Sequence, residues 1–132
     1  MAQRLPMKYL MDTCALIALV EGGLSRRAAL AVEQTPEVFV SLTSLWEVAI
    51  KHASGKLSIS LKPFDWYERL LLRHELTELP ITRQNTVRAS ALPPIHKDPF
   101  DRLIIATALL HKLIIVTCDE KITQYPEIKT LW

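Results

Sequence analysis

The fold of this chain is decided by the stretch Met7–Leu16, which reads MKYLMDTCAL. Lys8–Met11 is a mostly apolar run of strand length that ends at the carboxylate of Asp12, and an apolar, helix-favouring run, Ala15–Val20, follows almost at once. This order predicts a strand that leads into a helix at Asp12. Ligands bind at the carboxyl ends of the strands in open α/β sheets. Asp12 is therefore a candidate site residue if other polar side chains reach the same edge.

Strand and helix signals alternate along the rest of the chain. Further strands are expected at residues 37–41, 78–81, 114–117 and 128–131. Helices are expected at residues 13–20, 25–34, 43–54, 63–74, 82–92 and 99–111, with a short helical turn near residue 121. The helix at 43–54 is expected to bury the apolar stripe Leu45, Trp46, Ala49, Ile50 and Ala53. This alternation predicts an α/β fold, a three-layer α/β/α sandwich around a central, mainly parallel sheet of four to five strands.

The composition is that of a folded, mildly basic chain. Its 132 residues fit one domain, and a hydrophobic content of 49% with only three Gly argues against disorder. The net charge of +2 permits a polyanionic partner without requiring one. Cys14 and Cys118 match neither a disulfide framework nor a zinc pattern. We expect them to be reduced, half-buried thiols of a cytoplasmic protein.

The first six residues are expected to form a loose leader before a single domain at residues 7–132. The start lacks the apolar segment of a signal peptide, and no apolar run approaches the roughly 20 residues of a membrane span. Met7 is an alternative to Met1 as the first residue. These features predict a cytoplasmic location and no membrane partner.

Four carboxylates break the pattern of their surroundings: Asp12, Glu47, Asp101 and Asp119. Asp12 and Asp119 each end a predicted strand, Glu47 lies at the edge of an apolar helix stripe, and Asp101 lies on the apolar side of a predicted helix. Each also has an ordinary interpretation: a helix cap or turn for Asp12 and Asp119, an i,i+4 pair with Lys51 for Glu47, and a capping role for Asp101.

Three further polar residues accompany these acids. Thr13 and Thr117 lie beside the two strand ends, where a hydroxyl could bond a metal-bound water or a phosphate oxygen, or only satisfy a turn. Asp98 is expected to be the N-cap of the helix that begins at Pro99. A supporting role for Asp98 behind the site is left open.

If the two strand ends and the two helix starts meet, four carboxylates share one cleft. Two charges about 5 Å apart repel by roughly 3 kcal/mol at an effective dielectric constant of about 20, so four ionised acids need a cation. All-oxygen ligands favour Mg²⁺ or Mn²⁺ over zinc. No protein base is obvious, which suits a mechanism in which the metal supplies hydroxide.

Four ordered pieces of the chain match a known family: Leu10–Thr13, Ser44–Lys51 with Gly55–Leu57, His96–Arg102, and Thr117–Asp119. By these pieces the sequence resembles the PIN domain, and most closely the VapC-like ribonuclease toxins of prokaryotic toxin–antitoxin modules. The resemblance covers nearly the whole chain from Met7.

The resemblance implies a metal-dependent endoribonuclease that leaves a 5′-phosphate and a 3′-hydroxyl. Asp12, Glu47, Asp101 and Asp119 correspond to the acidic quartet that holds one or two Mg²⁺ or Mn²⁺ ions in this family. Thr117 matches the polar residue two positions before the last acid. The resemblance also implies RNA as the substrate, a cognate antitoxin that blocks the cleft, and a homodimer.

A negative quartet repels RNA until metal is bound, so nearby basic residues are candidate phosphate contacts. The candidates are Arg26, Arg27, Lys51, Lys56, Lys97 and Arg102. A scattered basic residue is more often a solvated surface charge, and that interpretation applies to each of them. His52 and His96 could also approach RNA, and neither has a role defined by the sequence.

Other function classes stay open at this point. A phosphatase of the haloacid-dehalogenase type, with Asp12 as nucleophile, expects a second Asp two residues on, where this chain has Cys14. A receiver domain phosphorylated on Asp expects an acidic pair after its first strand, whereas Asp12 is followed by Thr13 and Cys14. A non-catalytic binding module is the third alternative. Metal-dependent RNA cleavage would separate these classes.

Overall fold

The computed structural model describes residues 7–132, and the predicted leader at residues 1–6 lies outside them. The strands are β1 (Tyr9–Met11), β2 (Val38–Ser41), β3 (Thr77–Leu79), β4 (Ile114–Val116) and β5 (Thr130–Leu131). The helices are α1 (Thr13–Glu21), α2 (Arg26–Gln34), α3 (Leu42–Ala53), α4 (Pro63–Arg73), α5 (Arg83–Ser90), α6 (Pro99–His111) and α7 (Glu120–Thr123). Among these helices, none combines the length and apolar character needed to cross a bilayer.

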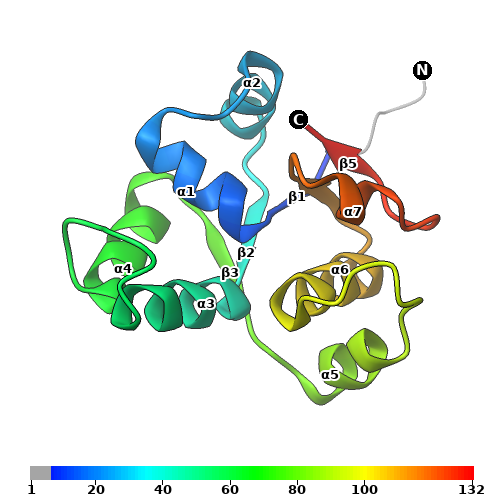
Figure 1. The fold of residues 1–132 in the computed structure, drawn as a ribbon. Coiled ribbons are helices and arrows are strands. Elements are labelled where there is room, and N and C mark those ends of the chain that lie inside the picture. The colour runs from blue at the N-terminus through cyan, green and yellow to red at the C-terminus, as the bar shows by residue number, and fades with distance from the viewer. Residues whose placement is uncertain (1–6) are drawn as a thin grey trace, which may run out of the picture.

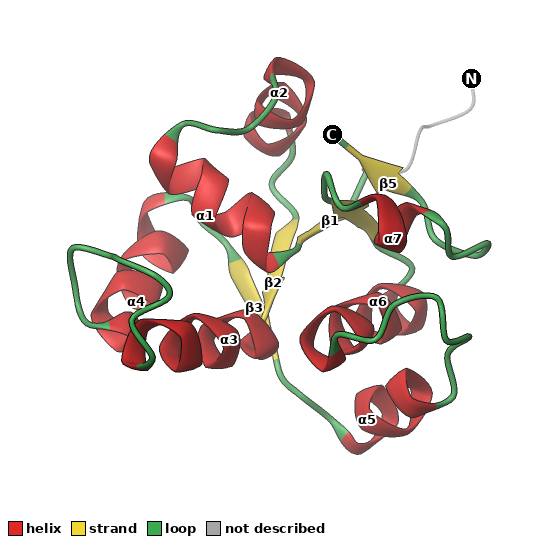
Figure 2. Ribbon diagram, in the orientation of Figure 1, coloured by secondary structure: helices red, strands yellow, loops and turns green. Residues whose placement is uncertain are grey.

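The strands form one parallel sheet in the order β3-β2-β1-β4-β5. β1 is central, and its last residue, Met11, pairs with Val40 of β2 and Val116 of β4. The carboxyl ends of these three strands therefore lie side by side (Figure 2). Residues that follow them, Asp12 and Thr117 among them, are brought to one edge of the sheet.

Alternate residues of β1 enter two separate cores. Tyr9 and Met11 belong to the core on one face, which α1–α4 cover, and Leu10 belongs to the core on the other face, together with Ile104 and Ile105 of α6. Figure 1 shows α1–α4 on one side of the strands and α5 and α6 on the other. Because both faces are covered, even the central strand is apolar throughout. The predicted three-layer α/β/α sandwich with a parallel sheet is confirmed.

The start of α3 differs from the prediction. The sequence predicts a cap at Thr43 or Ser44, whereas Ser41 is the N-cap and its Oγ accepts the Thr43 N–H at 3.0 Å. Ser41 is also the last residue of β2, so the strand passes directly into the helix. Smaller shifts occur elsewhere, since α5 ends at Ser90 and the final strand contains only Thr130 and Leu131.

The predicted buried face of α3 is wrong for Trp46, Ile50 and Ala53, whereas Leu45 is partly buried and packs against the core. Trp46 is 52% exposed and Ile50 is 44% exposed, whereas Thr43, Ser44, Glu47 and Val48 are buried. Polar contacts turn the helix this way, because the Ser44 hydroxyl bonds the Thr13 hydroxyl of α1 at 2.9 Å. The apolar count of a helix therefore does not decide its inward face where a polar group has a buried partner.

Both cysteines are exposed rather than half-buried as predicted. Cys14 is the second residue of α1, and Cys118 lies two residues beyond the end of β4. Each therefore follows a strand end at the carboxyl edge of the sheet, where the covering helices leave surface open.

Candidate metal centre

Asp12 lies where β1 ends and α1 begins, as predicted. It is the N-cap of α1, and its Oδ1 accepts the Ala15 N–H at 2.7 Å. The Thr117 side chain forms a second hydrogen bond to this carboxylate. Asp12 is only 2% exposed. The capping interpretation and the site interpretation are compatible, because the cap bond orients the carboxylate at the sheet edge.

Glu47 is also buried, with 5% of its surface exposed. Its Oε2 accepts a hydrogen bond from Lys51 Nζ at 2.6 Å, which is the predicted i,i+4 pair. Its Oε1 is buried and has no hydrogen-bond partner in residues 7–132. An unpartnered buried carboxylate oxygen is costly. Such an atom fits a site built to contact a cation.

Asp101 and Asp119 meet around His96. The His96 Nε2 lies 2.8 Å from Oδ2 of Asp101 and 3.1 Å from Oδ2 of Asp119. One ligand atom from each of the three residues lies within 4.8 Å of the others. Asp119 Oδ1 accepts the Lys121 N–H at 2.8 Å, so Asp119 also caps α7.

His96 is the site residue whose role sequence reasoning missed. It is buried, and its backbone N–H donates to the Tyr125 hydroxyl at 2.9 Å. The available signal was its place two residues before Asp98, in the His96–Arg102 piece that carries Asp101. That spacing does not predict that the imidazole contacts the carboxylates of Asp101 and Asp119.

The carboxylates influence one another electrostatically. Burial, reinforced by the charges of Asp119 and Glu47, raises the pKa of Asp12 to about 6, although the bonds from Thr117 and Ala15 oppose this rise. Burial, with the charges of Asp98, Glu47 and Asp12, raises the pKa of Asp101 to about 7 against the lowering effect of His96. The predicted acids therefore lie near enough to affect one another's pKa values, whereas the ligand atoms within 4.8 Å of one another in the described residues are those of His96, Asp101 and Asp119.

The three predicted supporting residues bond within this region. Thr117 Oγ1 accepts the Asp119 N–H at 3.0 Å and connects it to Asp12. Asp98 is the predicted N-cap of α6, with Oδ1 accepting the Asp101 N–H at 3.0 Å. The Thr13 hydroxyl is occupied by its buried bond to Ser44 and connects α1 to α3.

The predicted basic contacts divide into two groups. Lys56, Lys97, Arg26 and Arg27 are exposed, and Lys51 keeps an exposed side chain although it bonds Glu47. The prediction for Arg102 does not fit the structure. Its guanidinium donates to the carbonyl oxygens of residues 89, 92, 93 and 96 at 2.8–3.0 Å. These bonds use the guanidinium to stabilise a loop, so it is not placed to bind RNA.

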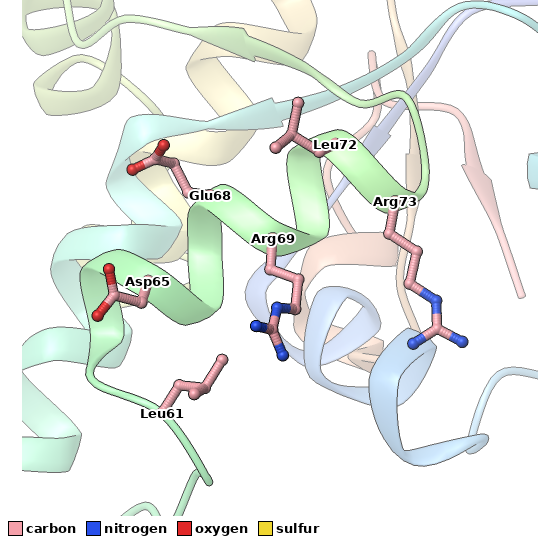
Figure 3. A pocket seen from close by; sticks show the side chains of 6 residues that line it. All are labelled: Leu61, Asp65, Glu68, Arg69, Leu72 and Arg73. Atoms are coloured by element: carbon pink, nitrogen blue, oxygen red, sulfur yellow. The ribbon is translucent and has the colours of Figure 1, made fainter.

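A surface pocket on α4 has a different character. Its lining residues are Leu61, Asp65, Glu68, Arg69, Leu72 and Arg73, and none of them is a predicted site residue. Figure 3 shows two acids and two arginines spread along the helix rather than gathered around one point. These exposed acids are useful as controls for the cluster.

Comparison with known proteins places the chain in a family. Residues 9–128 match the PIN domain family model. The chain therefore belongs to the PIN domain family, as its motifs predict. It is 30% identical over 112 residues to Ribonuclease VapC22 of Mycobacterium tuberculosis, and the match covers 83% of this chain and 85% of that protein.

Solved structures agree with this fold. A toxin–antitoxin complex from Klebsiella pneumoniae contains a chain that is 25% identical, with a TM-score of 0.66 and coverage of 95% of this chain and 97% of that one. VapBC2 from Rickettsia felis, bound to a DNA fragment from its promoter, is 16% identical with a TM-score of 0.69 and coverage of 95% and 98%. The second likeness shows the fold alone.

Proposed function

We propose that this protein is a metal-dependent endoribonuclease that hydrolyses RNA phosphodiester bonds, and the toxin of a toxin–antitoxin pair. The observation that carries the proposal is the close group of His96, Asp101 and Asp119, together with the effect of the Asp119 and Glu47 charges on the pKa of buried Asp12 at the carboxyl edge of a parallel sheet. The ribonuclease name of the VapC22 relative and the toxin–antitoxin complex that contains a 25% identical chain support the same assignment.

The residues present fit a hard divalent cation. Their donors are carboxylate oxygens, one of them the unpartnered Oε1 of Glu47, and two of the acids have raised pKa values. Asp12, Glu47, Asp101 and Asp119 would hold Mg²⁺ or Mn²⁺. Such an ion lowers the pKa of a water and offsets charge on a phosphate.

The chain's own residues prepare this site. The Ala15 N–H and the Thr117 hydroxyl orient the Asp12 carboxylate. Lys51 orients Glu47 through one oxygen and leaves the other without a hydrogen-bond partner among residues 7–132. Exposed Lys97 is placed to attract a phosphate toward a cluster that repels RNA when its acids are ionised.

The partners and organisation follow from the proposed role. RNA is the substrate, and a cognate antitoxin is the protein partner, as in the toxin–antitoxin complexes among the solved structures. One PIN-like domain at residues 7–132, a homodimer and a cytoplasmic location stay predictions. Light scattering of the purified protein measures its mass in solution and tests the homodimer. A mass equal to that of a single chain would contradict the homodimer.

RNA cleavage by the purified protein tests the function. Activity should disappear in EDTA and return with Mg²⁺ or Mn²⁺. Asp12→Asn should lower the rate by more than about 100-fold, because loss of residues that only support a metal already costs about 10–100-fold. Asp65→Asn, which changes an exposed acid on α4, is the matched control and should cleave at the parent rate. Cleavage that resists EDTA, or full activity of Asp12→Asn, would contradict the proposal.

The alternative enzyme classes give different results. An Asp-nucleophile phosphatase or a receiver domain would carry phosphate covalently on Asp12 after treatment with acetyl phosphate. Mass spectrometry detects that adduct, and we expect none. A non-catalytic binding module would bind RNA without cleaving it at any metal concentration.

A further inference from the structure

Trp46 and Phe100 form an aromatic pair between the two helices that carry Glu47 and Asp101. Their ring centroids lie 5.0 Å apart and their planes meet at 79°. This edge-to-face arrangement is one that aromatic rings favour. It joins α3 to α6, yet Trp46 remains half exposed and belongs to neither core. The pair is therefore a fixed aromatic surface that is open to a ligand.

Each ring of the pair is next in sequence to one of the predicted acids. Trp46 directly precedes Glu47, and Phe100 directly precedes Asp101. The Cα atoms of consecutive residues are about 3.8 Å apart. The negative charge of Glu47 in turn contributes to the raised pKa of Asp101. A nucleic acid strand whose backbone reaches these carboxylates would bring a neighbouring base to the two rings.

Basic side chains lie on the same two segments. Lys97 is exposed three residues before Phe100 and forms no salt bridge within residues 7–132. Lys51 follows Glu47 by about one turn on α3, and its side chain is partly exposed. Aromatic faces beside cationic side chains are the combination that binds single-stranded nucleic acids.

We propose that Trp46 and Phe100 form a stacking platform for an unpaired base next to the scissile phosphate of single-stranded RNA. This proposal rests on the nuclease function above and assigns a base-contacting role to two residues of this chain. Stacking tolerates any base, because every base has an aromatic face. It requires an unpaired base, because single-stranded loops and ends are where bases can be splayed out onto side chains.

A protein partner is the competing occupant of this surface. A stable protein interface buries about 800 Å² on each partner, whereas one aromatic side chain offers at most about 250 Å². Two rings beside an acidic cluster and exposed lysines match the size of a nucleotide better than that of a protein surface. RNA is therefore the occupant that the described residues favour.

Fluorescence titration tests the platform directly. Trp46 is the exposed tryptophan, since Trp66 is buried and Trp132 is packed against the core. The titration uses the Asp12→Asn background with Mg²⁺, so that cleavage does not interfere. The probes are a short single-stranded oligoadenylate and an abasic oligonucleotide of the same length and charge. Oligoadenylate should quench the fluorescence, and the quenching should be absent in the further variant Trp46→Leu.

The variants separate stacking from charge and from folding. The Trp46 variants lack the reporting tryptophan, so their affinities are measured by the fluorescence anisotropy of end-labelled oligonucleotides. Trp46→Leu should weaken oligoadenylate binding by about 5- to 100-fold and leave abasic binding unchanged. Trp46→Phe should restore most of the affinity, because it keeps a ring. Phe64→Leu, which removes a 64% exposed ring on α4, is the control and should have no effect. Melting temperatures of all variants report whether they fold.

The outcomes distinguish this proposal from the nuclease proposal. Equal oligoadenylate affinity of Trp46→Leu and its parent, or an equal loss with the abasic probe, would overturn the platform. A change of oligomeric state in Trp46→Leu with unchanged RNA affinity would also overturn it and assign the rings to a protein contact. Trp46-dependent binding by a protein that never cleaves RNA would support the platform and reject the nuclease.

Discussion

The Nε2 atom of His96 lies 2.8 Å from Oδ2 of Asp101. The same nitrogen lies 3.1 Å from Oδ2 of Asp119. The other ring nitrogen, Nδ1, accepts the Asp98 N–H at 3.3 Å, so Nε2 carries the proton and donates a hydrogen bond to Asp119, while the Asp101 carboxylate lies at ion-pair distance from the same nitrogen. The imidazole therefore offsets the repulsion between two acids that come from different elements of the fold.

Replacing His96 should expose this repulsion. We expect His96→Leu to lower the free energy of unfolding in EDTA by about 1–3 kcal/mol, because two partly buried carboxylates lose their contact with the imidazole. His96→Gln keeps an N–H donor and should lose less. Urea unfolding measures both variants. Excess Mg²⁺ should reduce the difference in unfolding free energy between each variant and the parent. Equal stability of the parent and both variants in EDTA would show that His96 does not offset the repulsion.

The raised pKa values predict that the metal-free protein becomes less stable as pH rises. The pKa values of Asp12 and Asp101 are about 6 and 7 in the folded chain, above their ordinary 3.8. Between about pH 4 and 7 the folded state therefore binds more protons than the unfolded state, and stability falls with increasing pH. A shift of about two units at buried Asp12 corresponds to about 3 kcal/mol.

Melting temperatures from pH 4 to 8 in EDTA measure this dependence. Asp12→Asn removes one of the titrating carboxyls, so its curve should be flatter and lie above the parent curve near pH 8. Asp65→Asn changes an exposed carboxyl and should follow the parent. A parent protein whose melting temperature rises steadily toward pH 8 in EDTA would show that the four acids do not share a cluster.

Divalent metal should stabilise the protein near neutral pH. A ligand that binds only the folded state at 100 times its Kd adds about 2.7 kcal/mol, which is about 10 °C for a domain of this size. The effect should weaken as pH falls through the pKa values of Asp12 and Asp101, because protons compete for the same oxygens. Thermal unfolding across a Mg²⁺ titration at pH 7.5 and pH 5 checks this, and identical shifts at both values would contradict it.

Much of the site could be predicted because its residues have local signatures. Asp12 ends an apolar strand and caps the following helix, and Asp98 and Pro99 mark the start of α6. Parallel pairing of β1 with β4 then brings Asp12 and Thr117 to the same edge. These features depend on short-range sequence and on one general rule of sheet topology.

The errors come from contacts that are distant in sequence. The inward face of α3 depends on the bond between Ser44 and Thr13, which are 31 residues apart. The position of His96 depends on Asp119, which is 23 residues away. Neither contact leaves a periodic signal, so counting apolar residues misplaced Trp46 and left His96 without a role.

Arg102 shows the same limit, and its contacts give a final prediction. Its Nη1 and Nη2 atoms donate to backbone carbonyls on the segment that leads to His96, including those of Ala89 and Pro93. A lysine ammonium cannot reproduce this planar fork. We expect Arg102→Lys to lower the free energy of unfolding by about 2–4 kcal/mol, since two or more carbonyl groups lose a donor. Urea unfolding measures the loss.

The matched control is Arg88→Lys, because Arg88 forms an exposed ion pair with Glu127 at 3.3 Å. Exposed pairs contribute about 0–1 kcal/mol, so this variant should unfold like the parent. Arg102→Lys should also weaken the stabilisation by Mg²⁺, because the loop that it releases carries the imidazole beside Asp101 and Asp119. If Arg102 instead contacted RNA, Arg102→Lys would keep the parent stability and lose only RNA affinity.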